Sequence, residues 1–115
     1  GRETNVQEFT TLHGADVGAE VTIGHGAVVD FATVDDHSLV GMGSRVLGGA
    51  TVESNCVVAA NAVVRKDQTV PEGHVAYGVP AETRPLTDDQ AAVIADTHEQ
   101  YVDLGRRFVE AGPHE

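Results

Sequence analysis

Residues 28–70 read VVDFATV DDHSLV GMGSRV LGGATV ESNCVV AANAVV RKDQTV, with valine at every sixth position. The valines of this ladder are Val28, Val34, Val40, Val46, Val52, Val58, Val64 and Val70. A small residue stands two positions before each of the first seven, namely Gly26, Ala32, Ser38, Ser44, Ala50, Cys56 and Ala62. A period of six fits neither an amphipathic helix nor a hairpin meander, and it indicates a repeat in which each short strand is followed by a turn.

The ladder extends less regularly toward the N-terminus. It continues through Ile23, Val17, Leu12 and Val6, with steps of five from Leu12 to Val17 and from Ile23 to Val28. Three strands close one triangular coil, in which the apolar residue points to the axis and the small residue lies at the corner. We therefore predict a parallel β-helix of about four coils over residues 1–76, with neighbouring coils about 4.8 Å apart. The alternative is an ordinary parallel sheet or sandwich.

A different period begins after the ladder. We expect a connection over residues 77–86 and one α-helix over residues 87–111, which makes the chain a single all-β domain with a C-terminal helix. Thr87 and Gln90 have the spacing of a capping box. An apolar stripe follows, made of Ile94, Tyr101, Leu104 and Phe108. A helix with so narrow a stripe is stable only when docked, so it should pack on the β-helix or on a neighbouring subunit.

The composition limits the classes of partner. Eighteen acidic and seven basic residues give a net charge of -11, which disfavours binding to nucleic acid or to an anionic membrane surface. The sequence has neither a spanning segment nor a signal-peptide pattern, so we expect a cytoplasmic protein without a membrane partner. The excess of carboxylates is typical of proteins from salt-loving organisms, and an ordinary acidic cytosolic protein is the alternative. Cys56, the single cysteine, is expected to be a packed, inert thiol.

The repeat resembles that of the hexapeptide-repeat proteins. This resemblance implies that the β-helix is left-handed and that the chain forms a homotrimer about a threefold axis. Four of the six histidines are expected to be solvated, namely His37, His74, His98 and His114. The other two, His13 and His25, lie in the repeat at positions that face outward. Counting the rungs places Asp30 one coil from His13 and places His25 on another face, so His25 can join the other two only from a neighbouring subunit.

Several stretches together resemble the gamma-class carbonic anhydrases over essentially the whole chain. They are Asn5-Val6-Gln7-Glu8 with Leu12-His13, then Ile23-Gly24-His25-Gly26-Ala27-Val28, then Val40-Gly41-Met42-Gly43, and then Gly78-Val79-Pro80-Ala81. The resemblance implies a zinc ion held by His13 and His25. Where the family has a third histidine, five residues after the second, this chain has Asp30. The family also has coils before its first ligand that this chain does not contain, so the chain is expected to be either a fragment or a shortened fold.

The resemblance implies a carbonic anhydrase-type lyase, a carbonate dehydratase that interconverts carbon dioxide and bicarbonate at a site between subunits. The metal would be zinc, or another divalent ion such as iron or cobalt, with His13, His25 and Asp30 as ligands. Gln7 would orient the attacking hydroxide, and Glu8 would help to move the proton out. Because an anionic ligand partly neutralises the charge of the metal, Asp30 is expected to weaken the activity.

Three alternatives remain open at this stage. Gln7 and Glu8 can instead be ordinary subunit contacts. The chain can also be a trimeric scaffold that has lost catalysis. A hexapeptide-repeat acyltransferase with a coenzyme A donor is a further alternative, but it would need an inserted loop with a general-base histidine, for which the unbroken ladder has no room, and a basic cluster for the nucleotide phosphates.

Overall fold

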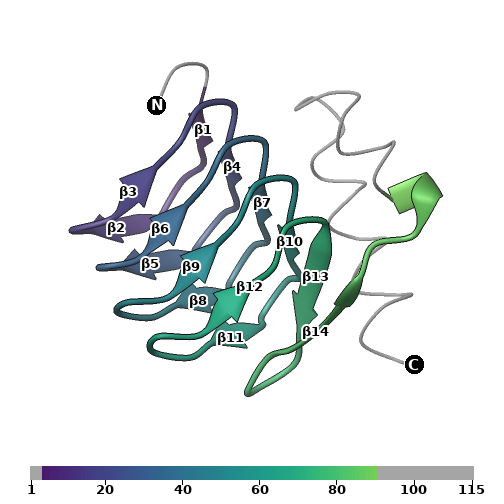
Figure 1. Ribbon diagram of the computed structural model, residues 1–115. Coiled ribbons are helices and arrows are strands. Elements are labelled where there is room, and N and C mark those ends of the chain that lie inside the picture. Colours follow the sequence, from purple (N-terminus) through teal and green to yellow (C-terminus); the bar gives the residue numbers. More distant parts are fainter. Residues whose placement is uncertain (1–3, 91–115) are drawn as a thin grey trace.

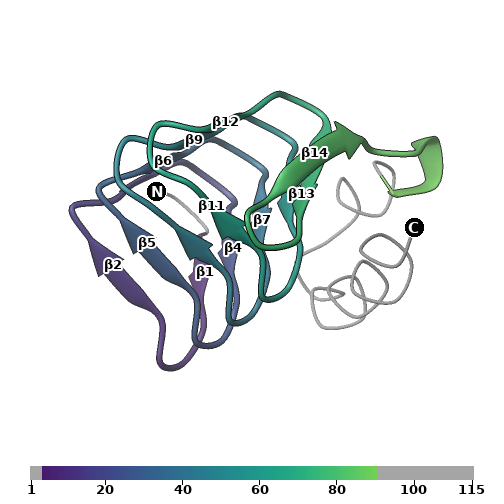
Figure 2. The ribbon, with the colours of Figure 1, turned by 90° about the horizontal axis from the view of Figure 1, so that it is seen from below.

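Short parallel strands stack into a three-sided solenoid in the computed structural model, which describes residues 4–90 of the 115 (Figures 1 and 2). The first sheet contains β1 (Asn5–Val6), β4 (Thr22–Ile23), β7 (Leu39–Val40), β10 (Val57–Val58), β13 (His74–Tyr77) and β14 (Glu82–Pro85). The second contains β2 (Thr11–His13), β5 (Val28–Asp30), β8 (Arg45–Val46) and β11 (Val63–Val64). The third contains β3 (Asp16–Val17), β6 (Thr33–Val34), β9 (Thr51–Val52) and β12 (Thr69–Val70).

The apolar ladder forms the core, as predicted. The residues that point inward from the three sheets have no exposed surface. They include Ile23, Val34, Val40, Val46, Val52, Val58, Val64 and Val70. The first coil is covered from one side only in the described part of the chain, so Val6 and Leu12 remain 44% and 42% exposed. The predicted parallel β-helix of about four coils is therefore confirmed.

The prediction for Val28 is wrong by one residue. Leu12 pairs with Val29, and Val28 pairs with Thr11 on the outer face. Val29 is fully buried, whereas Val28 is half-buried. The second five-residue step therefore runs from Val29 to Val34, and the small buried residue before it is Ala27. Two adjacent valines offer the same apolar side chain to either register, and only the pairing of the strands distinguishes them.

Every turn between consecutive strands from β1 to β13 contains one residue in the left-handed backbone region, which the tight corner requires. We name the corners by the sheets that they join. The first corner joins the first and second sheets and contains Phe9, Gly26, Gly43 and Asn61. The second corner joins the second and third sheets and contains Gly14, Phe31, Gly49 and Asp67. The third corner leads back to the first sheet and contains Glu20, His37, Asn55 and Gly73.

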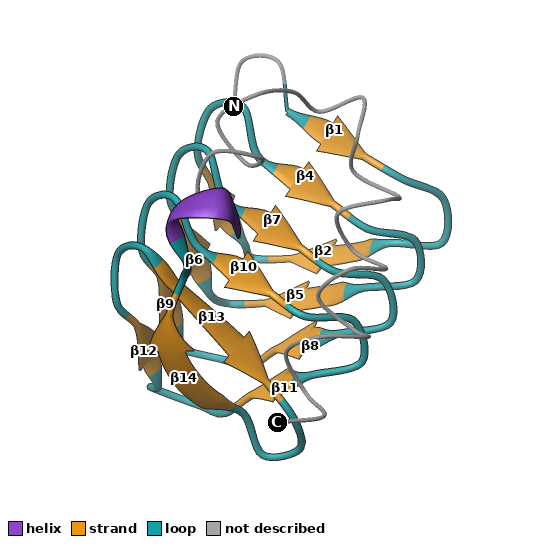
Figure 3. Cartoon of the chain, turned by 90° about the vertical axis from the view of Figure 1, so that its right-hand side faces the viewer, coloured by secondary structure: helices purple, strands orange, loops and turns teal. Residues whose placement is uncertain are grey.

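The solenoid ends in a hairpin. Strand β14, within the stretch expected to be a connection, pairs antiparallel with β13 at the edge of the first sheet (Figure 3). The expected capping box is present, since Thr87 Oγ1 accepts a hydrogen bond from Gln90 N at 3.1 Å and Gln90 Oε1 accepts one from Thr87 N at 3.0 Å. Helix begins at residues 88–90. The predicted continuation to residue 111, with its apolar stripe, lies outside the described residues.

Within residues 4–90, no helical segment combines the length and the apolar character that a transmembrane helix needs.

Candidate metal centre

The second corner brings His13 and Asp30 together. These residues end β2 and β5 and are direct partners in the parallel pairing of the two strands. Their side chains approach to 3.1 Å between His13 Nδ1 and Asp30 Oδ1. The imidazole is 71% exposed and the carboxylate 42% exposed, so both are open to the outside of the solenoid. The predicted proximity of the two residues is confirmed, although the register behind it was one residue off.

The two side chains have donors that suit a divalent metal. Imidazole nitrogen and carboxylate oxygen are both common ligands of zinc. Two donors on one tetrahedral zinc ion lie roughly 3.3 Å apart, because each bond is about 2.0 Å long. The observed 3.1 Å is close to this separation, and it is also a hydrogen-bond distance when Nδ1 carries the proton. The pair therefore fits two ligands of one metal site.

Phe31 also contacts the His13 ring. The two ring centroids are 4.6 Å apart with an angle of 65° between the planes, which is an edge-to-face contact. The same phenyl ring lies over Gly14, where a Cβ atom would collide with Phe31 Cδ1 and Cε1. His13 is thus restrained by the carboxylate of Asp30 and by the phenyl ring of Phe31.

The first corner contains the remaining predicted site residues. His25 lies in the turn between β4 and β5, and its ring is in edge-to-face contact with Phe9 at 5.3 Å and 70°. One coil away, Gln7 N donates to Ile23 O at 3.0 Å, and Glu8 O accepts from Gly26 N at 3.1 Å. Gln7, Glu8 and His25 therefore share a corner, at the opposite end of the second sheet from His13 and Asp30.

One chain does not assemble the full set of predicted ligands. Within residues 4–90, no three side chains of His, Cys, Asp or Glu are grouped so that they could hold a metal ion. A shallow groove of about 570 Å³ leads away from Asp30 and Phe31 along the second corner, past Leu47 and Gly48 to Lys66. The pair at the second corner is thus reachable from solvent, and His25 belongs to a separate surface of the same chain.

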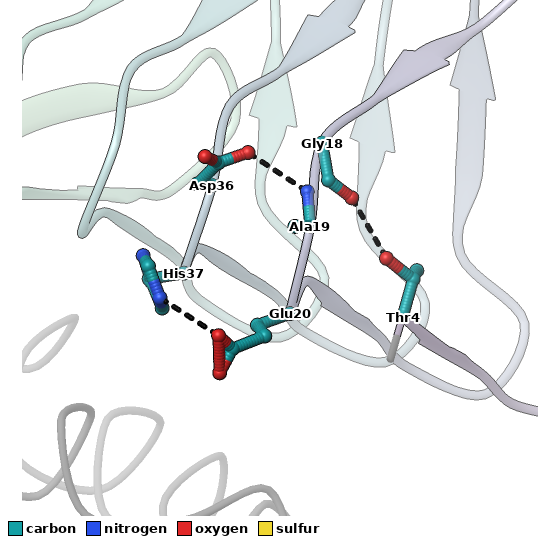
Figure 4. Close-up of polar contacts among 6 residues, drawn as sticks. All are labelled: Thr4, Gly18, Ala19, Glu20, Asp36 and His37. Atoms are coloured by element: carbon teal, nitrogen blue, oxygen red, sulfur yellow. Dashed lines mark hydrogen bonds and ion pairs between the residues drawn. The ribbon is translucent and has the colours of Figure 1, made fainter. Parts of the chain in front are cut away.

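The third corner has a polar cluster of its own, shown in Figure 4. His37 Nε2 lies 3.1 Å from Glu20 Oε2, and the two side chains are 51% and 42% exposed. Asp36 Oδ1 accepts a hydrogen bond from Ala19 N at 2.8 Å. His37 was predicted to be solvated, and its ring is indeed largely exposed, although it has a carboxylate partner.

Cys56 is packed inside the solenoid, as predicted. Its side chain is fully buried, and Sγ donates to Pro71 O at 2.8 Å. Burial raises the pKa of the Cys56 thiol above its ordinary value, with smaller contributions from Glu53 and Glu72, while the backbone groups of His74 and Gly73 oppose the shift. The thiolate, which is the reactive form, is therefore disfavoured at neutral pH.

Phe9 and Phe31 were missed by sequence reasoning. Each stands at the left-handed position of its corner, where the neighbouring coils have Gly26 or Gly14. A bulky residue is uncommon in this backbone region. The signal that could have identified them is therefore a phenylalanine in a column of corner residues that otherwise favours glycine.

Comparison with known proteins agrees with this architecture. The family described as bacterial transferase hexapeptide (six repeats) matches residues 31–66. The crystal structure of a hexapeptide transferase family protein from Anaplasma phagocytophilum superposes with a TM-score of 0.82 at 32% sequence identity, over 94% of this chain and 67% of that one. The chain belongs to the hexapeptide-repeat family.

Within this family the chain is gamma-carbonic-anhydrase-like. It is 36% identical to the mitochondrial gamma carbonic anhydrase 2 of Arabidopsis thaliana over 92% of its own length. It is 29% identical to protein YrdA of Escherichia coli over 97% of its length, which is 68% of that protein. The chain spans only 42% of the plant protein. The resemblance inferred from the motifs is confirmed.

Proposed function

We propose that this chain catalyses the reversible hydration of carbon dioxide to bicarbonate at a metal site shared between the subunits of a homotrimer. The observation that carries the proposal is the contact of 3.1 Å between His13 and Asp30, at the positions that match the family's ligand segments. Similarity to a gamma carbonic anhydrase over nearly the whole chain supports it. The native metal in this proposal is zinc or a similar divalent ion.

The ligand set needs two copies of the chain. His13 and Asp30 come from the second corner of one subunit, and His25 comes from the first corner of the next. In a closed ring, one patch of each copy contacts a different patch of its neighbour, so three equivalent sites arise. Two histidines and one carboxylate leave a fourth position open on a tetrahedral zinc ion.

Each group has a defined task in this proposal. The metal would act as a Lewis acid that lowers the pKa of a bound water to about 7. Gln7, on the same corner as His25, would orient the attacking oxygen through its amide, and the exposed Glu8 would accept the released proton and pass it to solvent. The negative charge of Asp30 would reduce the effect of the metal, so we expect slower turnover than with three histidines.

Metal analysis of protein purified without a chelator tests the proposal. We expect near-stoichiometric zinc, iron or cobalt in wild-type trimers and its loss in His25→Ala trimers of unchanged mass. Hydration of carbon dioxide, followed by stopped-flow with a pH indicator, should require the bound metal. A wild-type trimer that takes up no metal at saturating zinc would refute the enzymatic function.

A trimeric scaffold without catalysis is the second candidate. The observation that favours it is Asp30 itself, a carboxylate at the position of the family's third histidine. A scaffold would form the trimer and would keep its mass when His13, His25 or Asp30 is replaced, with or without zinc. The enzyme needs bound metal and the scaffold does not, so the metal analysis distinguishes the two functions, whereas both keep the mass of the trimer.

A further inference from the structure

Two of the chain's three phenylalanines occupy strained corner positions. Phe9 and Phe31 have backbone φ angles of +61° and +50°. The other non-glycine residues with positive φ in the described part of the chain are Glu20, His37, Asn55, Asn61 and Asp67. Those side chains are polar, and asparagine, aspartate and histidine enter this region more readily than bulky residues do. Backbone strain of this kind often marks a functional site, so the two phenylalanines call for an explanation.

Packing among residues 4–90 does not explain either ring. Phe9 is 80% exposed and Phe31 is 58% exposed. Each nevertheless makes one specific aromatic contact, Phe9 with His25 and Phe31 with His13. These are the two histidines of the proposed metal site, and they lie on different corners of the solenoid.

We propose that Phe9 and Phe31 meet across the subunit interface and form an aromatic clamp around the shared site. This inference rests on the proposed function, because the partner that covers each exposed ring is a second copy of this chain. If His25 of one subunit approaches His13 and Asp30 of the next, the contacts within each chain bring Phe9 to the same place as Phe31. Each site would then have a phenyl ring from each of two subunits beside its imidazoles.

The clamp would have two effects on the site. Edge-to-face contact restricts rotation of the imidazoles, so that their nitrogens remain aligned with the shared site. Burial of two phenyl rings at the contact removes apolar surface from water and lines the site with apolar groups, which suits a small neutral substrate such as carbon dioxide. Phe9 and Phe31 are thus positioning residues and interface anchors.

Glycine variants test the clamp without disturbing the fold. Phe9→Gly and Phe31→Gly relieve the left-handed strain, so the midpoint of thermal unfolding of each metal-free chain should stay close to that of the wild type. Glu20→Gly is the matched control, since it makes the same change at the third corner. Phe9→Asn and Phe31→Asn are second variants, because asparagine already occupies such corners at Asn55 and Asn61. Phe31→Tyr retains the aromatic edge and should behave as the wild type.

The measurements are trimer dissociation by sedimentation and zinc affinity by competition with a chromophoric chelator. We expect each phenylalanine variant to weaken the trimer about tenfold or more. The trimer of the double variant should be only slightly weaker than that of either single variant, because the effects of replacing two residues in contact are not additive. Zinc affinity should fall in parallel, and Glu20→Gly should change neither quantity.

Two results would overturn the clamp alone. One is that the phenylalanine variants assemble and bind zinc as the wild type does. The other is that their effects on the trimer add, which would show that the rings do not meet. A wild-type chain that stays monomeric at saturating zinc would overturn the clamp together with the proposed function.

Discussion

Two histidine–carboxylate pairs in this chain have nearly the same geometry and different surroundings. His13 and Asp30 at the second corner, and His37 and Glu20 at the third, each bridge neighbouring coils at 3.1 Å between nitrogen and oxygen. In both pairs the partners are 17 residues apart, which is the length of one coil in this N-terminal part of the solenoid. Both are also largely exposed.

The difference lies in what surrounds each pair. His13 is in edge-to-face contact with Phe31, and its corner lies at the end of the sheet whose other end carries His25. Near His37, Asp36 contacts the backbone of Ala19, and no aromatic ring among residues 4–90 contacts the His37 ring. A contact between histidine and a carboxylate is therefore an ordinary product of coil stacking, and a site depends on its neighbours as well.

The largest difference between the pairs is expected in metal binding. His13→Ala should abolish near-stoichiometric zinc binding, because it removes a ligand, whereas His37→Ala should leave the zinc content unchanged. Zinc content by elemental analysis of trimers with equal mass measures this. Equal loss in both variants would mean that zinc binds to exposed histidines generally.

The second largest difference is expected when the carboxylate charge of each pair is removed. Asp30→Asn should lower zinc affinity by about 10- to 100-fold, because the neutral amide is a weaker zinc ligand than the carboxylate. Glu20→Gln, the matched change at the third corner, should have no effect. Chelator competition at fixed ionic strength measures both affinities, and an unchanged affinity of Asp30→Asn would remove Asp30 from the site.

A third histidine should improve the site. Asp30→His is expected to raise the rate of carbon dioxide hydration by roughly tenfold, because a neutral ligand leaves more positive charge on the metal and makes the bound water more acidic. Glu20→His creates a similar pair of histidines at the third corner and should add no activity. Stopped-flow hydration assays of zinc-loaded trimers decide this, and a slower Asp30→His enzyme would contradict the assigned effect of the carboxylate.

The smallest difference is expected in the stability of the metal-free chain. Both pairs are exposed, and exposed ion pairs contribute about 0–1 kcal/mol. His13→Ala and His37→Ala should therefore change the free energy of unfolding by similar, small amounts when zinc is absent. Urea titrations of chelator-treated protein measure this free energy. A much larger loss of stability in His13→Ala than in His37→Ala would indicate a structural role for the His13 ring.

The sequence predicted the solenoid because a single repeat determines both its strands and its corners. Val34 to Val70 all stand at the expected inward positions. The register failed only at Val28 and Val29, where two equal side chains compete for one inward position. Strand β14 was not foreseen, because it follows the ladder and pairs antiparallel with β13.

The candidate site was predictable in part. Coil counting brought Asp30 to His13 and kept His25 apart, because the pairing of parallel strands is periodic along the chain. The contacts of Phe9 and Phe31 were not predicted, since they depend on the backbone angles of two corner residues and on side-chain directions. Periodicity predicts which residues stack in neighbouring coils, but it does not predict which exposed rings contact each other.

Mixed trimers test most directly whether the site is shared between subunits. His13→Ala and His25→Ala chains should each bind no zinc alone, because every interface lacks a ligand. When the two chains are co-expressed in equal amounts and assemble at random, mixed trimers regain one intact interface, so about a quarter of the wild-type zinc content should return. Recovery of zinc in the mixture would support a site built from two chains. A mixture that remains free of zinc, while wild-type trimers bind it, would contradict the shared site.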